Sequence, residues 1–311
     1  MKKQKKNNII KILTIFLLVI TLSGCTKTLT DKNNKPVKSS ETGRAMTENI
    51  VCKPTDAETI KIYEKNGVKI DKLPECNKMS ITGKYEDLWN SFFVRPLAFI
   101  IIKIGNFVGN IGLGLIIVTL LIRLVLYPVT RKTAVQSELI KEAQPELNKL
   151  EKKYEGKTDA ESMNKKSQEM MLIYKKYNIN PLSGCLFSFI QLPLLLAFLE
   201  AINRVPAIFE GTFIGLKMGM TPFKAISIGK YYYIILCILI ILTTYLSFKM
   251  NKSTASKELE QNNRIMMLFM TVFIGIMSFS LPTAIAIYWI TSSVFTIIQN
   301  FITDRSKKKN A

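Results

Sequence analysis

The chain has 311 residues, 48% of them hydrophobic, and its formal net charge is +20, from 43 Lys and Arg against 23 Asp and Glu. A chain that is both apolar and strongly basic is unusual for a soluble protein, and indicates either membrane spans with basic loops or a nucleic-acid binder. The apolar residues form blocks close to the roughly 20 residues that cross about 30 Å of hydrocarbon, which favours the membrane protein. The sequence has no histidine and no CxxC motif, so we expect neither a metal site nor a cofactor.

Residues 1–24 are typical of a targeting signal, because the basic MKKQKK precedes the apolar IIKILTIFLLVITL. The following LSGC resembles the lipobox of bacterial lipoproteins, which implies that Cys25 is lipidated and becomes the first mature residue. The alternative is an uncleaved anchor. Either way, we expect residues 25–87 to lie outside the cytoplasm, where a lipid chain would tether them.

Residues 25–87 are polar, rich in lysine and without strong periodicity, which predicts a small, loosely structured extracytoplasmic segment. Cys52 and Cys76 fall in this segment, where a disulfide is chemically permitted, although the sequence does not settle whether it forms. Cys185 and Cys237 lie in apolar blocks and are expected to be small core residues.

An interfacial amphipathic helix is predicted at 88–109, because Arg95, Lys103 and two asparagines interrupt its aromatic and aliphatic residues. The first mature span follows at 110–130.

Residues 131–180 predict a cytoplasmic αα-hairpin, since two apolar stripes recur at helical spacing on either side of a turn at 155–159. We expect Pro145 to kink or restart the first helix. The first stripe is Val135, Leu139, Ala143, Leu147, Leu150 and Tyr154, and the second is Met163, Met170, Tyr174 and Tyr177.

The remaining apolar blocks predict four more spans, because the last block is about twice the needed length and contains Pro282 near its centre. Clustered Lys and Arg in the hairpin, in one loop and in the tail place these parts in the cytoplasm, with the mature N-terminus outside the cytoplasmic membrane. The expected boundaries are 181–202 (second span), 203–229 (extracytoplasmic loop), 230–248 (third span), 249–263 (cytoplasmic loop), 264–281 (fourth span), 283–303 (fifth span) and 304–311 (basic cytoplasmic tail).

Arg123 lies inside the first predicted span, where an arginine costs about 2.5–3.5 kcal/mol. Glu200, the only carboxylate in the five predicted spans, lies near the outer end of the second span, whereas Arg123 lies in the inner half of the first. We therefore expect Arg123 to be unpaired and to face a water-accessible cavity open to the cytoplasm.

Other polar side chains in the spans could line the same groove. Those in the last span recur at spacings of three and four residues and so share one face. The alternative is local: hydroxyls that bond to their own helix, an amide that joins helices, and an arginine that snorkels inward. The groove candidates are Thr119, Gln191, Trp289, Ser292, Thr296 and Gln299.

Three stretches resemble the YidC/Oxa/Alb family of membrane protein insertases in its bacterial lipoprotein-type form. They are RLVLYPVT with its continuation AQPELNKLEKKY, KKYNINPLSGCLFSFIQLPLLLAFLEAI, and LPTAIAIYWITSSVFTIIQNFI. The resemblance covers roughly residues 87–305. It implies an all-α polytopic fold with five transmembrane helices around a polar groove open to the cytoplasm. Arg123 and Gln191 match the groove arginine and glutamine, and Tyr288 and Trp289 match the aromatic pair where substrate passes.

The implied function is the insertion and folding of nascent membrane proteins, and of lipoproteins as further clients, without breaking a bond, so we expect no enzyme. The implied partners are the ribosome, the Sec translocon, the signal recognition particle receptor and membrane lipids. The alternative is a secondary transporter that uses Glu200 and Arg123, although five spans do not divide into repeated halves. An intramembrane enzyme lacks a candidate residue pair in the spans, and nucleic-acid binding alone would leave the groove residues unexplained.

Overall fold

The computed structural model describes residues 27–81, 87–180, 183–250 and 257–308. The predicted signal peptide and Cys25 lie outside these residues. The chain divides into two compact units, and each is described separately. Unit 1 contains Met1–Val118, Leu192–Leu236 and Phe279–Tyr288, and unit 2 contains Thr119–Gln191, Cys237–Ser278 and Trp289–Ala311.

The N-terminal part of unit 1 has its own small core, although the sequence suggests a loose segment. Its elements are α2 (Ala57–Lys65) and the short helices η1 (Ile70–Lys72) and η2 (Cys76–Lys78). Four isolated β-bridges, all within residues 28–75, take the place of regular strands. This explains why no strand periodicity marks this core in the sequence. A disulfide joins Cys52 to Cys76. The core residues are Leu29, Met46, Ile50, Tyr63 and Ile70.

The predicted interfacial helix corresponds to η3 (Asn90–Val94) and α3 (Arg95–Phe107). One side of α3 is buried, whereas Phe107 at its end is 90% exposed. After a turn in which Gly109 has φ of +73°, α4 (Ile111–Lys153) begins directly against α3. A Cβ on Gly114 would lie 2.6 Å from the backbone nitrogen of Gly105, so the two helices approach through glycines.

The rest of unit 1 comes from the end of α6 (Ser183–Arg204) and the connection that follows it. This connection contains α7 (Pro206–Phe209), the antiparallel strands β1 (Thr212–Phe213) and β2 (Leu216–Lys217), α8 (Pro222–Ser227) and η4 (Tyr231–Tyr233). Thr212 pairs with Lys217, and Phe213 with Leu216. Backbone hydrogen bonds from Val51 to Arg204 (3.0 Å) and from Thr221 to Thr42 (2.9 Å) attach the N-terminal part to this connection.

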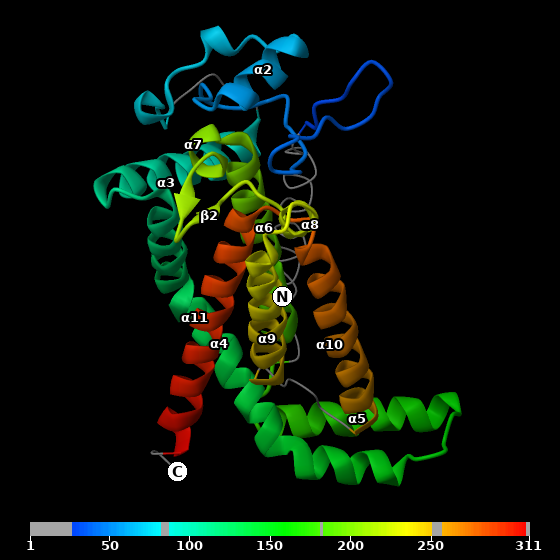
Figure 1. Ribbon diagram of the computed structural model, residues 1–311. Helices are drawn as coiled ribbons and strands as arrows, with labels where there is room; N and C mark the ends of the chain where they lie inside the picture. The colour runs from blue at the N-terminus through cyan, green and yellow to red at the C-terminus, as the bar shows by residue number, and fades with distance from the viewer. Residues whose placement is uncertain (1–26, 82–86, 181–182, 251–256, 309–311) are drawn as a thin grey trace. The chain divides into compact units, whose positions relative to one another are not determined.

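Unit 2 contains most of α4, together with α5 (Ala160–Lys176), and α4 changes direction where its apolar half meets its charged half (Figure 1). The expected restart at Pro145 does not occur, because α4 runs through both Pro128 and Pro145. Packing offsets the roughly 3 kcal/mol cost of an interior proline. The cluster that joins α4 to α5 is Ile140, Ala143, Leu147 and Ile179, with Leu139, Met170, Ile173, Tyr174 and Tyr177 packed around it.

Three further helices complete the chain: α9 (Ile234–Met250), α10 (Lys257–Ser278) and α11 (Thr283–Lys308). Among the described residues, three helices are long and apolar enough to cross a membrane, at Ile111–Lys153, Tyr231–Met250 and Thr283–Thr303, and a shorter apolar helix covers Arg264–Ser278. The span predicted at 181–202 begins at residues outside the described ones. The number of five spans therefore stays a prediction.

Candidate functional site

Arg123 is the centre of a buried polar cluster in unit 2. Its side chain is 4% exposed, and Nη2 donates hydrogen bonds to Oε1 of Gln191 (2.6 Å) and to Oγ of Ser292. The expectation that Arg123 is unpaired and faces a water-accessible cavity is therefore wrong, because its side chain is hydrogen-bonded and buried. A buried guanidinium needs acceptors for its donors, and α6 and α11 each supply one. These two acceptors are neutral, so they orient the cation without cancelling its charge.

A second polar contact joins the same two helices α4 and α11. The hydroxyl of Thr130 donates to Oε1 of Gln299 at 3.0 Å. Thr130 lies seven residues after Arg123, and Gln299 lies seven residues after Ser292. Both helices advance by seven residues, which are two helical turns, between the first contact and the second. Contacts that advance equally and in the same direction along two helices indicate that the helices run parallel. The polar face of α4 thus meets that of α11 at two levels.

The sequence did not identify Thr130, because it stands at the predicted end of the first span. Its signal is nevertheless present, since Thr130 falls on the same helical face as Arg123, two turns away. Thr119, one turn before Arg123, is 1% exposed and continues this face.

The other groove candidates make different contacts. Trp289 donates from Nε1 to Oγ1 of Thr244 at 2.8 Å. Thr296 donates to the backbone oxygen of Ser292, on its own helix, at 3.0 Å. The bond of Thr296 is the local bonding that the alternative interpretation expects for a hydroxyl in a span. Tyr288 belongs to unit 1, where its fully buried ring stacks on Phe198 with 4.1 Å between centroids. The structure therefore brings together Arg123, Gln191 and Ser292.

Glu200, the residue on which the transporter alternative depends, lies in unit 1 beside Arg204. The two side chains are buried, with 3.8 Å between a carboxylate oxygen and Nη1. Arg204 also donates from Nε to the backbone oxygen of Asn49 at 2.8 Å. Glu200 thus contacts an arginine on its own helix, and this arginine also holds the N-terminal segment.

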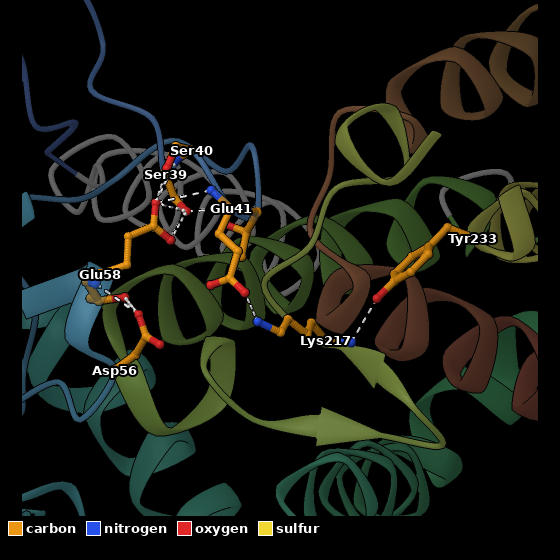
Figure 2. Close-up of polar contacts among 9 residues, drawn as sticks. Ser39, Ser40, Glu41, Asp56, Glu58, Lys217 and Tyr233 are labelled. Carbon is orange, nitrogen blue, oxygen red and sulfur yellow. Dashed lines mark hydrogen bonds and ion pairs between the residues drawn. The ribbon is translucent and has the colours of Figure 1, made fainter. Parts of the chain in front are cut away.

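Another polar cluster lies in unit 1. It contains Glu41, Asp56 and Glu58, which each have a carboxylate oxygen within 4.8 Å of the others (Figure 2). Protein groups already use these carboxylates. Glu58 accepts from the backbone nitrogens of Ser40 (2.9 Å) and Glu41 (3.1 Å), and Asp56 caps α2. Glu41 pairs with Lys217. The carboxylates hold a turn and a helix start in place, and they give no reason to propose a metal.

Comparison with known proteins places the chain in a family. The model of the family described as 60Kd inner membrane protein matches residues 103–310. The membrane protein insertase YidC of Oceanobacillus iheyensis is 34% identical over 241 residues, which cover 75% of this chain and 91% of that protein. The insertase YidC of Alkalihalophilus pseudofirmus is 35% identical over 73% of this chain and 86% of its own length. The insertase MisCA of Bacillus subtilis is 32% identical over 72% of this chain and 82% of its own length.

A solved structure described as an active YidC insertase with its first transmembrane domain resolved is 18% identical, with a TM-score of 0.45. The match covers 80% of this chain and 50% of that one, so the chain spans half the length of that structure.

The family model, the similarity to the insertases of the three bacteria and the apolar helices identify an integral membrane protein. The chain belongs to the 60Kd inner membrane protein family, the family of the YidC insertases. This confirms the resemblance that RLVLYPVT and the two later stretches indicate. Members of this family are insertases rather than enzymes.

Proposed function

We propose that this chain inserts nascent membrane proteins into the cytoplasmic membrane, and that Arg123 receives the polar segment that must cross. The observation that carries this proposal is the guanidinium in the apolar half of α4, which is held by Gln191 and Ser292. A cation at this position contributes nothing to the apolar packing of the spans and costs several kcal/mol to place there. A function that needs positive charge within the membrane explains why it is there.

The energetics of the bilayer explain how a cation within the membrane can assist insertion. A membrane protein can place a short polar segment outside only by moving it through hydrocarbon, where each unsatisfied polar group costs several kcal/mol. In this proposal, five spans surround a groove open to the cytoplasm, and the groove shortens the dry part of the path. Arg123 attracts acidic residues of the incoming tail through charge-assisted hydrogen bonds, and the substrate enters lipid as its apolar helix partitions.

The remaining parts of the chain have roles outside the groove. The charged half of α4, the helix α5 and the basic tail face the cytoplasm and receive the ribosome, the signal recognition particle receptor or the substrate itself. The chain works alone or beside the Sec translocon, and its clients include lipoproteins. A lipid on Cys25 tethers the mature N-terminus on the outer side.

Replacement of Arg123 tests the charge directly. Arg123→Ala should reduce insertion of a substrate with an acidic translocated tail roughly tenfold, the effect of losing about 1.5 kcal/mol from a hydrogen bond to a charged group. Insertion should fall much less for the same substrate with a neutral tail, and Arg123→Lys should restore part of it. The measurement is protease protection of the tail in reconstituted vesicles.

Arg131→Ala is the matched control, because Arg131 lies on the same helix two turns later but is exposed. It should leave insertion of both substrates unchanged. Equal losses for the acidic and neutral tails with Arg123→Ala would contradict the role of charge and leave only a packing role.

The secondary transporter has no support from the comparisons, since the relatives are named as insertases. Glu200, which such a transporter would use, lies beside Arg204.

A further inference from the structure

Three of the most exposed apolar side chains of unit 1 lie in the connection between α6 and α9. Ile214 at the turn of the β1–β2 hairpin is 82% exposed, Phe223 in the first turn of α8 is 72% exposed, and Tyr231 at the start of η4 is 63% exposed. Exposed apolar surface costs about 25 cal/mol per Å² in water. Side chains of this size on three separate elements therefore indicate a surface that is covered by something else.

Hydrogen bonds hold this connection at the ends of the apolar helices. Each of its three elements is attached to the residues where a helix begins or ends. The contacts are Asn110 Nδ2 to the oxygen of Thr212 (3.1 Å), beside the start of α4; Lys217 N to the hydroxyl of Tyr233 (2.8 Å), directly before α9; and Phe223 N to the oxygen of Phe279 (2.9 Å), between α10 and α11.

These helix ends lie at or near the starts of the candidate membrane spans. Two of the three candidate spans begin at Ile111 and Tyr231, and the third begins at Thr283, shortly after Phe279. We therefore expect the hairpin and α8 at the level where hydrocarbon gives way to headgroups. The hairpin is also tied to the N-terminal segment, since Lys217 pairs with Glu41 (Figure 2).

The amino-acid composition of the connection is typical of the boundary between hydrocarbon and headgroups. Lys217, Lys224 and Lys230 accompany the three apolar residues, and tyrosine with lysine is the usual combination where a chain meets headgroups. The exposed apolar surface continues from Tyr231 into α9, where Ile235 is 58% exposed. This continuity with a candidate membrane span favours lipid over a protein partner as the occupant.

We propose that Ile214, Phe223 and Tyr231 form a lipid-binding collar, whose apolar side chains enter the outer boundary of the acyl chains while the neighbouring lysines contact anionic phosphate. The collar supports the hairpin and, through Lys217, the N-terminal segment. The proposal depends on the membrane location of the chain and not on its activity as an insertase. The connection predicted as a plain extracytoplasmic loop at 203–229 is then part of the membrane surface.

Photo-crosslinking to lipid tests the collar. The photoreactive residue p-benzoylphenylalanine is placed at Ile214 or at Phe223 of the full chain, which is reconstituted in vesicles of phosphatidylglycerol and phosphatidylethanolamine. The control position is Lys65, which is exposed at the end of α2. We expect phospholipid adducts in several-fold higher yield at Ile214 and Phe223 than at Lys65, as measured by mass spectrometry.

Two results would overturn the collar. One is a lipid yield at both positions no higher than at Lys65. The other is a second protein as the main adduct in native membranes. Both substituted positions are exposed, so folding should persist, and the unchanged protease resistance of the N-terminal segment verifies it. If one variant fails this check, the other position decides the question.

Discussion

Three arginines are buried among the described residues, and different groups hold each of them. Arg204 has a carboxylate neighbour in Glu200, 3.8 Å away. Arg44 has an aromatic one, since its guanidinium carbon lies 3.4 Å from the ring centroid of Phe209. Arg123 donates to an amide and a hydroxyl. A carboxylate, an aromatic ring or neutral hydrogen-bond acceptors can therefore each accompany a buried guanidinium.

For Arg44, the free-energy cost of burying the charged guanidinium opposes the stabilisation from its contacts. Burial lowers its pKa to about 10. The folded unit therefore binds fewer protons than the unfolded chain above pH 10, and stability rises with pH there, while below pH 10 the full cost of about 3 kcal/mol is present. Its hydrogen bond to the oxygen of Asn203 (3.0 Å) and its contact with the ring of Phe209 both favour the charged form and offset part of this cost.

We therefore expect Arg44→Met to leave the stability of unit 1 within about 1 kcal/mol at neutral pH, because the cost and the benefit disappear together. Arg44→Ala should destabilise it by about 2–4 kcal/mol through the cavity that it leaves. The measurement is the urea dependence of proteolysis within the N-terminal segment. Equal damage from both variants would show that the charge, not the volume, holds this position.

The sequence predicted the members of the Arg123 cluster better than their contacts. Gln191 and Ser292 stand out because polar residues are rare in apolar blocks, and the spacing of Ser292 and Gln299 puts them on one face. Which acceptor meets which donor depends on the register between α4 and α11, and nothing local specifies that register. Tyr288 illustrates the limit, because its ring stacks in unit 1, whereas the indole of the very next residue, Trp289, donates to Thr244 in unit 2.

At the scale of elements, α4 shows why boundaries were harder to predict than helices. Its apolar and charged halves differ in composition, and Pro145 is a usual sign of a break. The packing of Ala143 and Leu147 against α5 keeps the helix continuous, and this tertiary contact is invisible in the local sequence. For the same reason, the core around Met46 and Tyr63 was not predicted, since irregular chain builds it.

The crossing of α3 and α4 should be sensitive to a single methyl group. Gly114→Ala would place a carbon 2.6 Å from the backbone of Gly105, and backbone cannot move aside as a side chain can. We expect a loss of about 1–3 kcal/mol in stability and faster hydrogen exchange in α3. Leu113→Ala, at the neighbouring exposed position, is the control and should have a smaller effect. Unchanged exchange in Gly114→Ala would mean that the helices can separate without cost.

Two glutamates should make the contact between α4 and α5 sensitive to acid. Hydrogen bonds from Lys176 and Tyr177 lower the pKa of Glu146, and those from Lys153 and Tyr154 lower that of Glu169. A carboxylate whose pKa is lower in the folded state contributes stability that is fully present above its usual pKa and is lost as pH falls through the folded value. Hydrogen exchange in α5 should therefore accelerate below about pH 4.5.

The double variant Glu146→Gln and Glu169→Gln should show this faster exchange already at neutral pH, and should lose most of the acid dependence. Glu161→Gln is the control, since Glu161 pairs within α5 with Lys165 and does not reach α4. If the double variant keeps the exchange rates and the acid response of the unchanged chain, other groups govern this contact.

At the scale of the whole molecule, the chain combines a core that the family model matches with an N-terminal segment that lies before this match. The family model matches residues 103–310, and the N-terminal segment with its disulfide precedes that match. The contacts of Arg123 lie in unit 2, whereas those of the N-terminal segment lie in unit 1. The two can therefore be disturbed separately.

Cys52→Ser with Cys76→Ser should destabilise the N-terminal segment by about 3 kcal/mol, as expected for a crosslink between residues 24 apart. Insertion of an acidic-tailed substrate in vesicles should continue, because the Arg123 cluster is unaffected. Proteolysis and the insertion assay measure the two effects side by side. A parallel loss of insertion would show that the N-terminal segment takes part in the work of the core.

The oxidation state of the same cysteine pair also depends on the compartment in which the segment lies. Thiols stay reduced in the cytosol and oxidise outside it, so with the predicted topology this bridge closes only after its loop has been exported. Quenching cells with a thiol-alkylating agent and counting modified cysteines would thus date the export of the segment during biogenesis.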